Sequence, residues 1–335
     1  MNTTRLFGFD KDDEGQLRVN PEQGAVVRRI FREYLRGFGE GEIARRLRED
    51  GIPGITGAPR WSSTTVRRML QNEKYQGDLL LQKYYTVSFL TGECARNEGA
   101  LDQYFVMDAH EGIVSREEWE AVQQERARRL AYREEFQLKK LENTNPFLNR
   151  IRCAACGGMV VRGYGKAGRE PFWRCAAACR KHRGTSTRTT FPEQEVRRVI
   201  WAAWAQLVEN RAVYEMKWRT TMESPEALAL EKVRARQMMA LMKAARGTGR
   251  GPEGKVAGAD EGTKARGWAG ADEGTAGTEE DVFSEERTAA EMWESDAWIR
   301  MVLGYMIAGE CEYRVGFLDG SEVTVMVGTE HPTDF

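Results

Sequence analysis

The chain has 335 residues, 41% of them hydrophobic and 30% charged, which is enough for two or three folded domains. It contains no run of 18 apolar residues and no hydrophobic stretch near its N-terminus. We therefore expect no transmembrane helix, no membrane partner, no secretory signal and a cytoplasmic protein. The net charge of −1 conceals two segments of opposite sign: residues 150–198 carry 12 Lys and Arg residues against 3 Asp and Glu residues, whereas residues 251–296 carry 4 against 13. The basic segment predicts a polyanionic partner, and the acidic segment predicts a solvated linker.

Two short helices are predicted near the N-terminus. Asn20 is a favourable N-cap, Gln23 occupies the capping-box position, and apolar residues then recur at helical spacing up to Leu35. The second helix is expected over residues 41–50, and Gly51 is its expected C-terminal cap.

A third helix is expected to begin after Ser62, a favourable N-cap, with Trp61 and Val66 placed as a hydrophobic staple. Two short helices followed by a helix with a polar, basic outer face resemble a helix-turn-helix with a long turn. This pattern favours a DNA-reading helix, and the alternative is an ordinary helical core with a solvated basic face. The outward residues expected to contact DNA are Ser63, Thr64, Arg67 and Arg68.

Residues 75–107 have a strand-like composition on either side of a polar stretch over residues 91–100, which predicts a loop. Cys94 lies in that stretch and is expected to be an unremarkable free thiol. Ser115 and Glu118 then form the pattern of a capping box, which predicts the start of a long charged helix.

Four of the six cysteines lie close together, which indicates a metal site rather than a disulfide framework. Cys153 and Cys156 form a Cys-x-x-Cys-Gly-Gly motif, and Cys175 and Cys179 follow after 18 intervening residues. This spacing predicts a zinc ribbon with a two-stranded hairpin, in which Zn²⁺ is structural because four protein ligands leave no open position. The second pair encloses three residues, where ribbons commonly have two, so His182 is an alternative fourth ligand.

Basic residues surround the cysteine motif, and aromatic residues lie among them. Such a surface predicts contacts to the phosphates of double-stranded DNA, and docking onto an acidic protein surface is the alternative. The residues expected to contact DNA here are Arg162, Lys166, Arg169, Arg180, Lys181 and Arg183, and Arg150, Arg152 and Arg174 extend the same basic rim.

The remainder of the chain combines helices with a low-complexity segment. Helices are predicted over residues 191–208 and 225–246, and the second is a helical arm whose apolar residues keep no steady heptad register. Residues 247–280 contain two copies of a polar heptapeptide, which predicts a flexible linker. A returning helix is expected over residues 285–308, followed by a hairpin that turns at Asp319-Gly320.

The order of these parts resembles a known family. The first half resembles the "recombinase" domain of large serine recombinases, and the cysteine module with its arm and closing hairpin is similar to the family's zinc-ribbon domain. The resemblance covers roughly residues 2–210. It is carried by the opening Asn2-Thr3-Thr4-Arg5-Leu6-Phe7-Gly8-Phe9-Asp10 and by Glu42-Ile43-Ala44-Arg45-Arg46-Leu47, Gly51-Ile52, Trp61, Val66, Met69-Leu70, Asn72, Tyr75, Gly77 and Leu80-Leu81-Gln82-Lys83.

The resemblance predicts an α+β multidomain chain, in which a helix-turn-helix-like recombinase domain is followed by a zinc ribbon with an inserted helical arm. The expected parts are a recombinase domain over residues 1–142, a zinc ribbon over 143–200, a helical arm over 201–246, a linker over 247–280 and a returning helix with closing hairpin over 281–335.

The family's activity is site-specific cleavage and exchange of DNA strands, used by phages and mobile elements to integrate and excise. In that family a separate N-terminal domain carries the nucleophilic serine, and no segment here resembles it, so we expect no catalytic residue in this chain. We therefore expect the DNA-binding portion of a recombinase, with self or an intact recombinase as a further partner through the arm. The alternatives are a stand-alone zinc-dependent DNA-binding regulator, a protein-interaction module or a decayed remnant.

Overall fold

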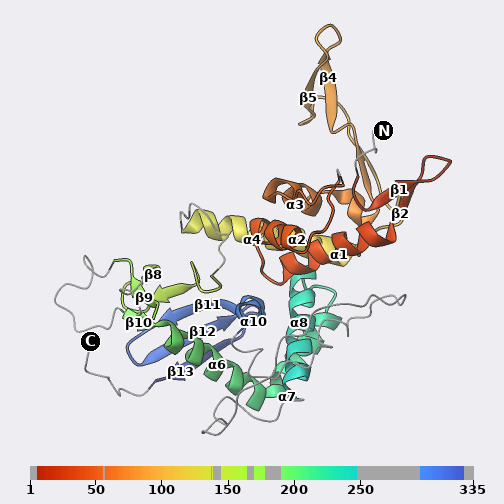
Figure 1. Ribbon diagram of the computed structural model, residues 1–335. Helices are drawn as coiled ribbons and strands as arrows, with labels where there is room; N and C mark the ends of the chain where they lie inside the picture. The colour runs from red at the N-terminus through yellow and green to blue at the C-terminus, as the bar shows by residue number, and fades with distance from the viewer. Residues whose placement is uncertain are drawn as a thin grey trace, which may run out of the picture.

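The computed structural model describes residues 6–55, 57–136, 138, 145–163, 170–177, 190–246 and 295–327. The described residues build two hydrophobic cores, one from the N-terminal helices and one from the cysteine module with the C-terminal strands. Figure 1 shows these two bodies joined by the long helix α8 (Ala229–Arg246), which runs from one to the other. The α+β organisation predicted from the sequence is confirmed.

Four helices form most of the first core, and their capping residues act largely as predicted. The side chain of Asn20 accepts a hydrogen bond from the Gln23 amide over 3.0 Å. Gln23 does not close a capping box, because its side chain instead accepts from the amide of Gly8 over 2.8 Å and holds the preceding segment against the helix. Ser115 and Glu118 do form the predicted capping box. The helices are α1 (Pro21–Leu35), α2 (Glu40–Glu49), α3 (Ser63–Leu70) and α4 (Arg116–Glu135).

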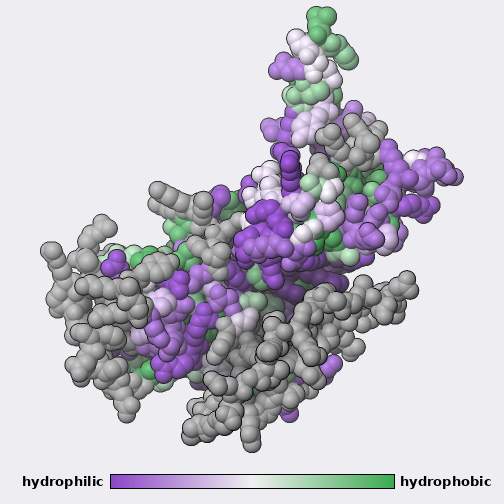
Figure 2. Space-filling model, in the orientation of Figure 1, coloured by the Kyte–Doolittle hydropathy of each residue, from purple (hydrophilic) through white to green (hydrophobic). Residues whose placement is uncertain are grey.

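Short antiparallel strand pairs accompany these helices, together with the 3-10 helix η1 (Glu73–Gln76). The loop predicted over residues 91–100 is wrong in part, because Glu93–Arg96 pairs with Tyr84–Ser88 as a hairpin. This hairpin projects from the domain and exposes Phe89 and Leu90 at its tip, where Figure 2 is strongly hydrophobic. The pairs are β1 (Phe9–Lys11) with β2 (Leu17–Val19), β3 (Leu79–Leu81) with β6 (Tyr104–Val106), and β4 (Tyr84–Ser88) with β5 (Glu93–Arg96).

The second core combines two small sheets with the helices α6 (Glu193–Glu209) and α10 (Asp296–Val302). One sheet has the strand order β10-β9-β8 and contains the predicted ribbon hairpin. The other has the order β13-β12-β11-β7, so β7 from the cysteine module continues the C-terminal sheet. The strands are β7 (Ile151–Cys153), β8 (Val160–Gly163), β9 (Phe172–Cys175), β10 (Thr190–Pro192), β11 (Leu303–Ala308), β12 (Glu312–Phe317) and β13 (Glu322–Met326).

The returning helix predicted over residues 285–308 is wrong in its last part. Residues 285–294 lie outside the described residues, and the helix α10 ends at Val302. Leu303–Ala308 forms the strand β11, because it lies between β12 and β7 and Met306 pairs with Ile151. The predicted hairpin turn at Asp319-Gly320 is confirmed, and Gly320 has a φ of +80°, which glycine adopts without strain.

The helical arm contains one helix that the sequence pattern did not indicate, α7 (Arg211–Glu223), which packs against α8. The absence of a heptad register in α8 has a structural cause. Its first turns bury Leu230 and Val233 in the N-terminal core, whereas Met238, Leu241 and Met242 are buried in the second core. A helix that serves two cores on different sides keeps no single apolar seam. Among the described residues, no helix has the length and apolar composition needed to cross a lipid bilayer.

A buried carboxylate holds α8 against α4. The Glu125 carboxylate, only 4% exposed, accepts from Arg128 and Arg129 of its own helix over 2.8 and 2.7 Å and from Arg234 of α8 over 2.7 Å. Arg234 also donates to the carbonyl of Leu318, between β12 and β13, over 3.0 Å. Burial by itself raises the pKa of Glu125, but the three guanidinium groups outweigh it and hold that pKa well below its ordinary value of 4.5.

We predict that Glu125→Gln lowers the free energy of unfolding at pH 7 by roughly 3 kcal/mol, because three guanidinium groups lose their buried counter-charge. The folded-state pKa of Glu125 lies below its unfolded value, so this contribution is present above pH 4.5 and is lost progressively as the pH falls towards the lower folded pKa. Urea denaturation of wild type and variant should therefore give a difference that shrinks on acidification. Glu120→Gln, at an exposed position of the same helix, is the control, and an equal loss in both variants would contradict the assignment.

Candidate nucleic-acid interface and metal centre

The helix α3 is fixed against α2 by its N-terminal segment. The side chain of Ser62 accepts from the Thr65 amide over 3.1 Å, as the N-cap prediction requires. The buried Trp61 donates its indole N–H to the carbonyl of Ile52 over 2.9 Å, and Arg48 of α2 donates to the carbonyl of Trp61 over 2.5 Å. These contacts clamp the long turn between the two helices, so α3 is presented on a rigid support.

The outward face of α3 carries the residues that the sequence placed there. Thr64, Arg67 and Arg68 are exposed, and Ser63 is half-buried. One contact was not foreseen: the Arg67 guanidinium pairs with the carboxylate of Glu40, at the start of α2, over 2.7 Å. Arg67 is therefore held by an internal counter-charge in this structure, whereas Arg68 projects from the exposed face of the helix.

Three of the predicted zinc ligands converge. The Sγ atoms of Cys153, Cys156 and Cys175 all lie within 4.8 Å of one another, and those of Cys156 and Cys175 are 3.4 Å apart. The glycines of the motif shape the turn: Gly157 has a φ of +67°, and the amide of Gly158 points at the Cys156 sulfur over 3.4 Å. Amides directed at sulfur and thiols at this spacing fit a tetrahedral zinc site.

The Cys175 thiol lies where a negative charge is unfavourable unless a cation is present. Burial raises the pKa of the Cys175 thiol to about 12, and the neighbouring Cys153 and Cys156 add to the effect. Thiolates this close together are stable only beside a cation, which is the role that a structural Zn²⁺ fulfils. Cys179 and His182, the two candidates for the fourth ligand, lie outside the described residues.

Family profiles match both parts of the chain. The profile described as "Recombinase" matches residues 21–129, and the profile described as "Recombinase zinc beta ribbon domain" matches residues 146–205. The chain has the recombinase domain and the zinc-ribbon domain of a large serine recombinase. The first match includes α1, α2, α3 and most of α4, and the second includes the converging cysteines and the hairpin of β8 and β9.

More distant similarities accompany these matches. A "Putative DNA recombinase" of Bacillus subtilis (strain 168) is 22% identical over 228 residues, which cover 64% of this chain and 44% of that protein. The chain thus spans less than half the length of this relative. A solved structure described as "Crystal Structure of a LSR-DNA Complex" aligns over 99% of this chain and 94% of its own, with 13% identity and a TM-score of 0.40. A second, described as "Sequence Requirements of the Listeria innocua prophage attP site", aligns over 62% and 78%, with 18% identity and a TM-score of 0.32.

The basic rim of the zinc ribbon is only partly open to solvent. Arg162 is paired with Glu193 over 2.8 Å. Arg150 donates to the carbonyl of Leu303 over 2.6 Å, and the guanidinium of Arg152 lies 4.0 Å from the centre of the Phe136 ring. Arg174 is exposed. The other predicted DNA contacts of this rim, Lys166, Arg169, Arg180, Lys181 and Arg183, lie outside the described residues.

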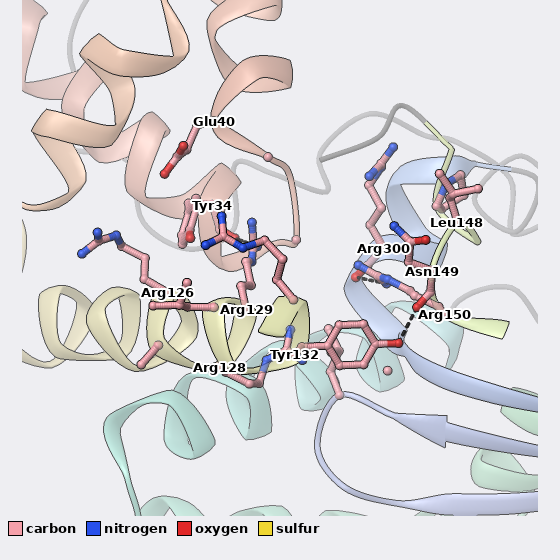
Figure 3. Close-up of a pocket in the computed structure, with 18 of the residues that line it drawn as sticks. Tyr34, Glu40, Arg126, Arg128, Arg129, Tyr132, Leu148, Asn149, Arg150 and Arg300 are labelled. Carbon is pink, nitrogen blue, oxygen red and sulfur yellow. Dashed lines mark hydrogen bonds between the residues drawn. The ribbon is translucent and has the colours of Figure 1, made fainter. Parts of the chain in front are cut away.

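A basic cavity that the sequence pattern did not indicate lies between the recombinase domain and the zinc ribbon. It has a volume of about 830 Å³, and Figure 3 shows arginines of α4 on one side with Arg150 and Arg300 on the other. The signal in the sequence was the series Arg126, Arg128, Arg129 and Arg133, which composition alone assigns to a solvated charged helix. Only the position of the second domain turns this helix face into the wall of a cavity.

We predict that the purified chain holds one Zn²⁺ and that Cys175→Ser releases it, because the thiolate is one of the ligands that close the site. Cys94→Ser is the matched control, since Cys94 is exposed on the hairpin of β4 and β5. Elemental analysis of the two variants gives the metal content. A Cys175→Ser chain that keeps its zinc, or a Cys94→Ser chain that loses it, would contradict the ligand assignment.

Proposed function

We propose that this chain binds double-stranded DNA as the DNA-recognition portion of a site-specific serine recombinase, through α3 and the zinc ribbon. The observation that carries the proposal is the exposed, hydroxyl- and arginine-bearing face of α3 on its rigid support, within a segment that matches the recombinase profile. The relative in Bacillus subtilis, described as a DNA recombinase, supports the same function.

In this proposal α3 lies in the major groove, which is wide enough for an α-helix. Thr64 and Arg68 face the base edges or the flanking phosphates. Arg67 binds a DNA phosphate after its ion pair with the Glu40 carboxylate breaks. Breaking this ion pair reduces the net contribution of Arg67 to the affinity for DNA. Ser63, half-buried at the start of the helix, contacts the DNA backbone.

The zinc ribbon binds the neighbouring segment of the same duplex. The proposed contacts are the predicted rim residues, with the Arg162–Glu193 ion pair as a competing interaction. Two modest interfaces on one chain gain affinity from their mutual effective concentration, so neither has to bind tightly alone. The role of the complete recombinase is proposed to be integration and excision of a phage or mobile element.

The arm offers a surface for a protein partner. On α7, Val213 and Met216 are 62% and 66% exposed and lie three residues apart on one helical face. We propose that this face contacts another copy of the chain or an intact recombinase, because apolar helix faces in contact with water favour association.

We predict that Arg68→Ala weakens binding to a duplex selected from a random pool by about 1–3 kcal/mol if Arg68 reads a guanine, and that it relaxes the preference at one base position. Arg219→Ala, an exposed arginine on α7, is the control with the same loss of charge. Fluorescence anisotropy titrations on selected and mixed-sequence duplexes measure both effects. An equal loss on both duplexes limits Arg68 to a phosphate contact, and no loss would refute the recognition-helix assignment.

We propose Cys179 as the fourth zinc ligand and predict that a Cys179→Ser chain substituted with Co²⁺ shows weaker sulfur-to-metal charge-transfer absorption than wild type, because one of four thiolates is lost. His182→Ala should leave the spectrum unchanged. The opposite pattern would assign the fourth position to the histidine.

A further inference from the structure

The cavity between the two domains has a wall of arginines. Ser63 and Arg67 of α3 line one end, α4 lines the floor, and the segment before β7 with the end of α10 lines the far side. Figure 3 shows the α4 arginines and Arg150 with Arg300 on opposite sides of this space. The lining arginines are Arg67, Arg126, Arg128, Arg129, Arg133, Arg150 and Arg300, and Glu40 is the carboxylate among the lining residues.

The cavity has an excess of positive charge even after its internal contacts are counted. Glu125, beneath the floor, neutralises part of the charge of Arg128 and Arg129. Arg126 donates to the neutral side chain of Gln123 over 2.7 Å, and Arg150 donates to a backbone carbonyl. Burial, with the nearby guanidinium groups, holds the pKa of Arg150 below its ordinary value. An anion in this space would lower the repulsion among these groups.

The spacing of the arginines on α4 fits a chain of phosphates. Arg126 and Arg133 lie seven residues apart on one face of the helix and are therefore about 10 Å apart along its axis. Arg129, between them, is held by Glu125 and by the carbonyls of Tyr34 and Phe38. Each strand of duplex DNA carries a phosphate about every 3.4 Å along its axis, so this distance matches a few consecutive phosphates. Guanidinium groups bind phosphate oxygens in pairs of hydrogen bonds, which makes arginine well suited to this role.

The cavity is also continuous with the proposed recognition helix. Ser63 and Arg67 of α3 line it together with Arg126 of α4, so the proposed recognition helix forms part of the cavity wall. Amides of Asn145 and Asn149, on the zinc-ribbon side, provide further polar groups at the opposite wall.

We propose that this inter-domain cavity is a phosphate-binding site, which holds the DNA backbone between the recombinase domain and the zinc ribbon. The identification of DNA as the source of the phosphates rests on the proposed function, whereas the binding of phosphate itself rests on the cavity. Because both domains line the cavity, the bound strand fixes their relative position.

The double variant Arg126→Gln/Arg133→Gln tests the site. Arg133 is exposed and Arg126 is half-buried, and the hydrogen bond from Arg126 to Gln123 stays within α4, so the fold should persist, as circular dichroism can verify. Arg211→Gln/Arg219→Gln removes the same charge from exposed positions of α7 and is the matched control. For each protein, the dissociation constant on a long mixed-sequence duplex is measured between 50 and 200 mM salt.

If the two arginines contact DNA phosphates, the slope of log Kd against log salt should fall by about 2 in the cavity variant and stay unchanged in the control.

A second experiment measures the melting temperature of each protein with added inorganic pyrophosphate. Stabilisation of wild type and control but not of the cavity variant, with an unchanged DNA slope, would assign the site to a free phosphate compound. An unchanged slope together with equal stabilisation of all three proteins, or none, would overturn the proposal. A wild type that binds no DNA would refute the proposed function alone, because the pyrophosphate arm still tests the cavity.

Discussion

The buried carboxylate of Glu125 is the interaction on which the arrangement of the two domains depends. It lies on α4, yet it binds Arg234 of α8, and Arg234 in turn reaches the turn between β12 and β13 through Leu318. One negative charge therefore connects the recombinase domain, the arm and the C-terminal sheet. A charge of this kind contributes strongly only when all its partners are present, because a buried guanidinium without a counter-charge is costly. The same group of ion pairs holds α4 in the position where it forms the floor of the inter-domain cavity.

The zinc ribbon is similarly tied to distant parts of the chain. Its first cysteine ends β7, and β7 pairs in parallel with β11, so a metal ion held by this cysteine would support the closing sheet as well as the ribbon hairpin. Trp173 of β9 and Trp204 of α6 are both fully buried in the same core. A ribbon that is too small to fold on its own thus shares its core with helices and strands from later in the chain.

Arginine has two distinct roles in this molecule. Arg129 and Arg234 stabilise the fold through a carboxylate and backbone carbonyls. Arg68 and Arg133 are exposed and available to a polyanion. The whole-chain charge of −1 is a sum over both kinds of arginine and an acidic segment. It therefore does not indicate the local electrostatic potential at either proposed DNA surface.

The local features of this protein were determined by the sequence alone. The caps at Asn20, Ser62 and Ser115, the turn at Gly320 and the convergence of three cysteines all depend on residues close together in the chain or on a highly specific spacing. The tertiary structure decided the features that depend on distant partners. Residues 303–308 form a strand rather than a helix because β7 and β12 complete a sheet on both sides of them. The apolar residues of α8 lack a heptad because two cores bury them, the charge of Arg67 is offset by Glu40, and a solvated-looking arginine face becomes a cavity wall. Periodicity and composition indicate the secondary structure that a segment prefers and which of its faces is apolar. They do not indicate which distant segment will pack against that face.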